Sequence, residues 1–257
     1  MIWTMVGQLR ECVLLNYRTP ARSVEGLLPD GLELVRRGDW AFWNVVVCRV
    51  EAMRPAGLEA VPAVGVSYHH VAYRLLVQAM TEHCDVRRGL YFVRSDADAA
   101  LLGAAGNRLS DFKFHRAEVQ LTANDERFDA RVSTADDRAP LQLAVRNGTP
   151  VHPIDSAFPT LNDAQRFLKY QPLGLSRRGP WLRYAEVFRD EAQWKEEAVS
   201  VEHARLGFFE TLGQTDTQLE LATRIAALPY RWRLGRRERL LVTPRKDAVS
   251  QPSAAVA

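Results

Sequence analysis

The stretch from Asp39 to Arg54, DWAFWNVVVCRVEAMR, constrains the fold more than any other part of the chain. Alternate residues form two sets that are both mostly apolar, as expected for a strand that is covered on two faces. Aromatic and β-branched residues favour a strand over a buried helix here. One face carries Trp40, Phe42, Asn44, Val46, Cys48 and Val50, and the other carries Ala41, Trp43, Val45 and Val47. We therefore expect a central strand in a packed sheet or a closed barrel.

The remaining sequence predicts many short strands and few helices. We expect strands over residues 12–15, 32–35, 67–78, 91–93, 112–121, 127–132, 141–145, 181–188 and 198–203, and a last hairpin over 231–242 that turns at Gly235. Helices are expected over 21–28 after a Thr19-Pro20 cap, over 97–105 after a Ser95-Asp96 cap, and over 160–170, with one helical turn over 208–212. Such a pattern is typical of a mainly antiparallel α+β architecture. We expect a single domain over 1–246 and a disordered tail over 247–257.

Composition excludes several classes of protein. The net charge is +3, from 34 basic and 31 acidic residues, which is too balanced to indicate a nucleic-acid partner. No apolar run approaches the roughly 20 residues of a membrane span, and we expect no membrane association. The three cysteines, Cys12, Cys48 and Cys84, form no CxxC pair, which favours a reduced, cytoplasmic compartment over a disulfide framework.

The order of motifs resembles a known family. Residues 16–58, NYRTPARSVEGLLPDGLELVRRGDWAFWNVVVCRVEAMRPAGL, are similar to the opening of the YqjF-like proteins, a bacterial family of unknown function, with its "LLP-x-GLEL" and "R-x-RP-x-G" segments. GLYFVRSDADAALLGAAGNRL (89–109) and FHRAEV (114–119) resemble two further segments of that family. The family is grouped with acetoacetate decarboxylase-like folds. The resemblance therefore implies a cone-shaped antiparallel β-barrel with peripheral helices and an internal ligand cavity.

The decarboxylases of that group use a barrel lysine that forms a Schiff base with a keto acid, assisted by a neighbouring cation, a glutamate and an arginine. The resemblance makes Lys113 the candidate for that lysine, because a desolvated lysine becomes nucleophilic at neutral pH. Phe114 follows it, where decarboxylases have a second lysine. The alternative interpretation is a lysine at a strand edge with its ammonium group in water.

The glutamate of the decarboxylases has no counterpart, since the corresponding Tyr-x-Glu segment reads Tyr68-His69-His70. Histidine can carry protons near neutral pH, so His70 and His115 are candidate proton carriers. Only one of His69 and His70 can face a barrel interior, because adjacent residues of a strand point to opposite faces.

Four further residues are candidate ligand contacts. Arg74 and Arg94 are candidates to bind a carboxylate through two parallel hydrogen bonds. Tyr68 and Trp43, together with Tyr91, either line the same cavity or belong to the core.

Other chemistries find little support. The ligand-type residues His69 or His70, His83, Cys84 and His115 lack metal-site spacing, so we expect no metal. There is no GxSxG, Walker or GxGxxG motif, and no cofactor is expected. The basic run 231–239, RWRLGRRER, is either a contact for nucleic acid or another anionic partner, or a solvated segment whose arginines pair with surface acids.

Two functions remain. The first is binding, with or without conversion, of a small keto or carboxylic acid in the barrel cavity. A cavity of some hundreds of Å³ with Lys113 or a histidine pointing inward would favour it. The second is a non-catalytic structural or interaction protein whose barrel is filled by Trp43, Phe42 and their neighbours. Because members of this superfamily often self-assemble, the resemblance leaves a homo-oligomer open.

Overall fold

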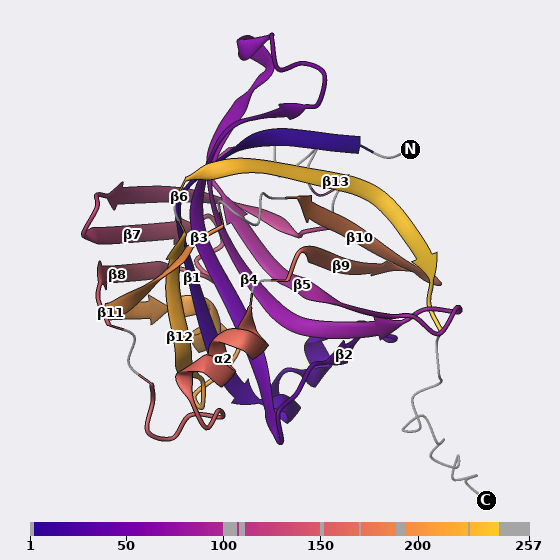
Figure 1. The fold of residues 1–257 in the computed structure, drawn as a ribbon, viewed down its shortest axis with the longest axis vertical. Coiled ribbons are helices and arrows are strands. Elements are labelled where there is room, and N and C mark those ends of the chain that lie inside the picture. Colours follow the sequence, from indigo (N-terminus) through magenta and orange to yellow (C-terminus); the bar gives the residue numbers. More distant parts are fainter. Residues whose placement is uncertain are drawn as a thin grey trace, which may run out of the picture.

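The computed structural model describes residues 3–99, 107, 111–149, 152–169, 171–188, 194–225 and 227–241. Strands dominate these residues (Figure 1). They are β1 (Trp3–Pro20), β2 (Glu33–Leu34), β3 (Trp40–Pro55), β4 (Val66–Met80), β5 (Val86–Ala97), β6 (Phe114–Ala123), β7 (Arg127–Thr134), β8 (Leu141–Asn147), β9 (Leu173–Arg178), β10 (Trp181–Phe188), β11 (Glu196–Leu206), β12 (Gln218–Ile225) and β13 (Leu228–Arg239). The helical elements are the 3₁₀ turns η1 (Ala21–Ser23), η2 (Glu25–Leu27) and η3 (Pro62–Val64), and the α-helices α2 (Leu161–Leu168) and α3 (Gly207–Thr211).

β3 is the central strand that the sequence predicts. It pairs antiparallel with β1 along one edge and with β4 along the other. Its side chains divide between two apolar clusters as expected from their alternation: Trp43, Val45 and Val47 belong to one cluster, and Phe42, Val46 and Cys48 to the other. The apolar character of both faces follows from this burial on two sides.

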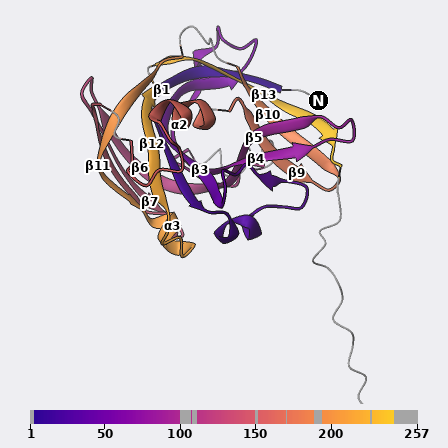
Figure 2. The same ribbon diagram turned by 60° about the horizontal axis from the view of Figure 1, so that its bottom comes forward.

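The strands close into two rings that share β1, β3, β4 and β5 (Figure 2). The β10 ring adds β9, β10 and β13 to the shared strands, and the β7 ring adds β6, β7, β8, β11 and β12. Among the described strands the pairing is antiparallel except where β5 meets β6 and β9. The mainly antiparallel architecture is therefore confirmed, while the cone shape stays a prediction.

Close approach of two backbones closes the β10 ring. β9 pairs parallel with β5 at Leu90–Gly174 and Tyr91–Leu175. A Cβ atom on Gly89 would lie 2.5 Å from the carbonyl oxygen of Leu173, which is closer than real Cβ atoms come to any heavy atom. Glycine is therefore required where β9 crosses this end of β5.

β1 borders both rings. One of its edges pairs with β3, and the other pairs with β13 from Trp3 to Leu9 and with β12 from Cys12 to Arg18. Between these two segments its register with β3 shifts, and Glu11 has a φ of 39°. Such a bulge bends the strand, and here it accompanies the change of partner.

Several predicted elements differ in the structure. Residues 21–28 form η1 and η2 instead of an α-helix, since Gly26 weakens a helix and β1 continues to Pro20. Ser95 and Asp96 lie inside β5 and cap no helix, because the Asp96 carboxylate pairs with Arg94. Of the predicted helix 97–105, Ala97 ends β5, and residues 100–105 lie outside the described residues.

The predicted turn at Gly235 is also wrong, because β13 runs through it without interruption. Gly235 has a φ of 95° and so accommodates a local distortion within the strand. β9 and β12 were not predicted. The predicted tail 247–257 lies outside the described residues, and no helix within the described ranges is long and apolar enough to cross a membrane.

Candidate functional site

An enclosed cavity of about 30 Å³ lies inside the β10 ring, and every strand of the ring contributes to its wall. This volume accommodates about two water molecules, since one water needs roughly 10–15 Å³ of such space. Larger hollows of about 490 and 690 Å³ lie elsewhere, but the described residues lining them include no buried histidine, cysteine or arginine. The cavity is lined by Leu9, Cys12, Leu14, Val46, Cys48, Val50, His70, Arg74, Leu90, Phe92, Phe112, Gln171, Leu173, Gly174, Ala185, Val187, Trp194, Tyr230 and Trp232.

β4 brings three of the predicted site residues to the cavity side of the shared wall. Tyr68, His70 and Arg74 occupy alternate positions and share one face, and each is 4% exposed. His69 points the other way, where its Nδ1 lies 2.7 Å from a carboxylate oxygen of Asp98. The structure therefore assigns the interior position to His70.

Arg74 is held by a row of amide side chains at one side of the cavity. Its guanidinium donates to Oδ1 of Asn44, and Nδ2 of Asn44 donates to Oδ1 of Asn16 at 2.7 Å. The guanidinium carbon also lies 5.5 Å from the ring centroid of Phe92. All three polar residues are buried, so the cation is fixed in an environment of low dielectric constant, in which it attracts anions more strongly than in water.

Two thiols face the same space. Cys48 on β3 is the direct cross-strand partner of His70 on β4, and Cys12 lies on the neighbouring strand β1. The Cys12 thiol donates a hydrogen bond toward the Cys48 sulfur, and this bond, with the nearby His70 and Arg74, lowers the pKa of Cys48 against the opposing effect of burial. The same contact with Cys48 and burial raise the pKa of Cys12. The pair therefore favours a thiolate on Cys48.

Two nitrogen atoms in the cavity wall are buried without a partner among the described residues. They are Nε2 of His70 and Nε1 of Trp232. A buried polar atom that makes no hydrogen bond costs about 1–3 kcal/mol, which makes such atoms rare. A polar group of a small molecule in the cavity is a candidate partner for either nitrogen.

Lys113 does not reach the cavity. It is exposed, and its Nζ lies 2.7 Å from the hydroxyl of Tyr91 and 4.6 Å from the centroid of that ring. Its neighbour Phe112 lines the cavity instead, stacked on Phe92 with ring centroids 4.0 Å apart. This placement gives no support to the Schiff-base role expected for Lys113, which lies in the segment before β6 with a φ of 56°.

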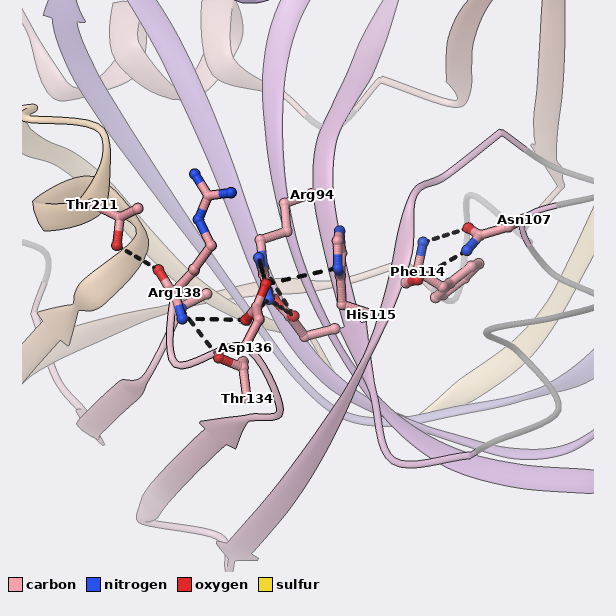
Figure 3. Close-up of polar contacts among 10 residues, drawn as sticks. Arg94, Asn107, Phe114, His115, Thr134, Asp136, Arg138 and Thr211 are labelled. Carbon is pink, nitrogen blue, oxygen red and sulfur yellow. Dashed lines mark hydrogen bonds and ion pairs between the residues drawn. The ribbon is translucent and has the colours of Figure 1, made fainter.

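Arg94 and His115 lie close to Asp136, which follows β7, and neither lines the cavity (Figure 3). Arg94 donates at 2.6–2.9 Å to Asp96 and at 2.8 Å to both carboxylate oxygens of Asp136. The exposed His115 has Nδ1 3.9 Å from Asp136, and burial, followed by the charge of Arg94, lowers its pKa. Hydrogen bonds from Arg94 lower the pKa of Asp136, whereas burial raises the pKa of Asp96. The structure separates both residues from the cavity.

Trp43 also belongs to the β7 ring. It is fully buried, and its ring lies 5.3 Å from that of Phe209 and 6.4 Å from that of Phe208, both on α3. Tyr91 belongs to the same apolar cluster. Trp43 thus packs in the core of the β7 ring and is not among the residues that line the cavity of the β10 ring.

Two further sequence hypotheses concern metal ligands and the basic run 231–239. Within the described residues, no three His, Cys, Asp or Glu side chains are grouped so that they could hold a metal ion. In the basic run on β13, Arg233 and Arg236 pair with Glu186, and Arg239 pairs with Glu82. Three arginines of the run thus pair with acids, while contact of the run with nucleic acid or another anionic partner stays a prediction.

Sequence reasoning missed the two thiols as site residues. Cys48 was placed on the correct face of β3, but its contact with His70 depends on the register of β3 against β4 across the intervening loop. Asn44, a polar residue inside an apolar strand, was the available signal that this face binds something polar. A second buried cluster was missed as well: Arg18 on β1 donates to Glu220 on β12 at 2.8 Å and to Asp155 at 2.7 Å.

Solved structures with the same fold are acetoacetate decarboxylase-like proteins. An acetoacetate decarboxylase-like enzyme from Sphingomonas wittichii RW1 superposes with a TM-score of 0.58 at 12% identity, covering 93% of this chain and 94% of that one. The acetoacetate decarboxylase of Legionella pneumophila gives a TM-score of 0.60 at 12% identity, covering 93% and 87%. The enduracididine biosynthesis enzyme MppR complexed with pyruvate gives 0.53 at 11% identity, covering 93% and 90%. At such identities the likeness shows the fold alone.

Comparison of the sequence with known proteins identifies a family but no curated relative. No curated protein matches this chain. One family profile, described as an uncharacterised conserved protein, matches residues 7–222. This span covers most of both rings, from β1 into β12. The chain therefore belongs to the DUF2071 family, the YqjF-like family that its motifs resemble.

Proposed function

We propose that this protein binds a small keto or carboxylic acid in the cavity of the β10 ring. The observation that carries the proposal is the buried Arg74 in the same enclosed, largely apolar space as the unpartnered Nε2 of His70. An apolar pocket with a few convergent polar groups is the usual form of a small-molecule site. A guanidinium matches a carboxylate through two parallel hydrogen bonds, which gives it geometric selectivity over other cations.

The residues have separate roles in this proposal. Arg74 binds the carboxylate of the ligand. His70 exchanges a hydrogen bond or a proton at Nε2 with the oxygen next to that carboxylate, and Nε1 of Trp232 donates to the same group. With about 30 Å³ available, the ligand has only a few carbon atoms, or side chains such as Trp194 and Gln171 rotate to admit a larger one.

The fold supports the ligand class by analogy. MppR, which shares the fold, is described in complex with pyruvate. Decarboxylases of this fold use a lysine, but the outward position of Lys113 leads us to propose a site without a Schiff base. The fold thus suggests the class of ligand, a small acid, whereas the residues of this chain suggest the chemistry.

Calorimetric titration with acetate, pyruvate and acetoacetate, and with acetone as the uncharged control, tests the proposal. We expect one of the acids to bind and acetone not to bind. Arg74→Lys keeps the positive charge but loses the two-pronged geometry, and should weaken binding at least about tenfold. Arg88→Lys is the matched control, because Arg88 lies on β5 outside the cavity and donates to the backbone of Phe167.

Lys113→Ala should bind the acid as the unmodified protein does, and borohydride should trap no adduct. Equal binding by Arg74→Lys and Arg88→Lys would contradict the role of Arg74. A trapped adduct that is lost in Lys113→Ala would instead restore the Schiff-base mechanism.

One observation favours the second function, a non-catalytic interaction protein. The cavity measures tens and not hundreds of Å³, and the β7 ring is filled by the rings of Trp43, Tyr73, Phe208 and Phe209. If none of the three acids binds at millimolar concentration, this alternative is the better account.

A further inference from the structure

Four groups from three neighbouring strands converge on one small space. Cys12 comes from β1, Cys48 from β3, and His70 and Arg74 from β4, and none is more than 4% exposed. All four line the enclosed cavity. The arrangement places a thiol and a basic imidazole beside a cation that binds carboxylates.

A buried cysteine is most often a small apolar residue of the core, and that interpretation suffices for a thiol among alkyl groups. It does not suffice here, because Cys48 lies opposite His70 across the β3–β4 ladder and next to a second thiol. His70 also keeps its Nε2 buried and without a partner among the described residues, so its hydrogen-bonding capacity is not consumed by the fold. Nucleophile and base within reach of each other are the arrangement that activates a cysteine.

We propose that Cys48 is the nucleophile of this site and adds reversibly to the keto carbon of the bound acid, with His70 as its proton carrier. This inference rests on the proposed function, because Arg74 must hold the carboxylate so that the adjacent carbonyl carbon lies near the Cys48 sulfur. It replaces the lysine chemistry known for the fold by thiol chemistry.

The addition balances without an external reagent. His70 takes the proton of the Cys48 thiol, and the thiolate sulfur forms a bond to the keto carbon. The π electrons of the C=O bond move to its oxygen, which takes the proton back from the imidazolium. The product is a hemithioketal, and the reverse sequence releases the acid unchanged. Charge on the oxygen is stabilised by Nε1 of Trp232 before the proton arrives.

Cys12 acts through Cys48 in this scheme. Its thiol donates toward the Cys48 sulfur and so favours the thiolate on Cys48, while its own proton is held more firmly. Cys12 is thus a positioning residue. Cys12→Ser retains a donor and should keep the pH profile of Cys48, whereas Cys12→Ala should shift that profile to higher pH.

Affinity labelling with 3-bromopyruvate tests the nucleophile. The reagent carries the carboxylate and keto group of the proposed ligand, and a thiolate displaces its bromide to form a stable thioether. The internal control is Cys84, an exposed thiol that does not line the cavity. We expect Cys48 to be labelled at pH 6 at least about tenfold faster than Cys84, and pyruvate to slow the labelling of Cys48 alone.

Peptide mapping by mass spectrometry reads the labelled position. No label on Cys48, or a label on Cys48 that pyruvate does not slow, would overturn the proposal. His70→Gln should slow the labelling of Cys48 and remove its advantage at pH 6 while leaving Cys84 unaffected. Unchanged labelling in His70→Gln would remove His70 from the mechanism.

Carbon-13 NMR of [2-¹³C]pyruvate with the protein separates this inference from the proposed function. A tetrahedral carbon signal that disappears in Cys48→Ala, while calorimetry still detects pyruvate binding by that variant, supports both. Binding without a tetrahedral carbon in the unmodified protein leaves the acid site and overturns the nucleophile. Absence of both binding and labelling overturns both proposals.

Discussion

The shared wall of β1, β3, β4 and β5 has two faces with different roles, although the same strands form both. On the β7-ring face, aromatic rings from α3 pack on Trp43 and Tyr73 and fill the interior. On the β10-ring face, a histidine, an arginine and two thiols surround a small cavity. Alternation along a strand lets neighbouring residues serve each purpose independently. One face can therefore carry polar groups that a core would exclude, because the other face supplies the packing.

Each face also buries an arginine, and their surroundings differ. Arg94 in the β7 ring is bonded to two carboxylates, Asp96 and Asp136. Arg74 in the β10 ring donates to the neutral amide of Asn44. Arg94 is therefore part of a structural ion pair, whereas Arg74 contributes its guanidinium to the wall of the cavity.

The largest change in stability is expected when the ion pair between Arg94 and Asp96 in the β7 ring is broken. Arg94→Met leaves Asp96, which is fully buried, without its cation, and should lower the free energy of unfolding by about 3–5 kcal/mol. Chemical denaturation measures the change. Arg205→Met removes an exposed arginine from its pair with Glu210 and should leave the midpoint unchanged. A midpoint for Arg94→Met equal to that of Arg205→Met would refute the structural role.

Two matched substitutions on β3 compare the filled interior of the β7 ring with the cavity of the β10 ring. Val45 is fully buried in the β7 ring, and its neighbour Val46 lines the cavity. Val45→Leu should cost about 1–3 kcal/mol because a filled core has no room for another methylene group. Val46→Leu can use the cavity and should cost less than about 1 kcal/mol, while it blocks binding of the acid.

Thermal unfolding of both variants, with pyruvate titration of each, provides the measurement. Equal losses of stability would show that the two interiors are packed alike. Retained binding by Val46→Leu would move the ligand away from the cavity.

The smallest expected effect is a pH dependence of stability that comes from Asp136 in the β7 ring. Hydrogen bonds from Arg94 hold the pKa of Asp136 below its unfolded value near 3.9, so this carboxylate stabilises the fold above about pH 4 and loses that contribution as the pH falls further. Asp136→Asn should therefore show a smaller loss of stability between pH 5 and pH 3 than the unmodified protein. Denaturation midpoints at pH 5, 4 and 3 test this, and parallel decreases would contradict it.

Local patterns predicted the parts of the fold that depend on neighbouring residues. β3 and its two faces, the β6–β7 hairpin and α2 followed from period and turn residues. The second half of β5 was not predicted, because Arg94 and Asp96 interrupt its apolar pattern. These polar side chains are buried in the strand because Asp136, a partner of Arg94, lies across the β7 ring. β9 and β12 alternate polar and apolar residues too briefly to stand out.

The same limit applies to the site. Alternation along β4 puts Tyr68, His70 and Arg74 on one face, and this needs no knowledge of other strands. The contact of Cys48 with His70 depends on the register between two strands, and the positions of Lys113 and Trp43 relative to the cavity depend on how the rings close. None of these is a local property of the sequence.

The double role of β1 has a consequence for synthesis of the chain. Both rings close only when β12 and β13 pair with β1, which is made before either of them. At about 5–20 residues per second, roughly 10–40 s pass before those partners leave the ribosome. Throughout that interval the nascent strand has an open edge of unpaired amides, a template for association with other chains. Productive folding in the cell should therefore depend on factors that shield β1 until β12 and β13 have been made.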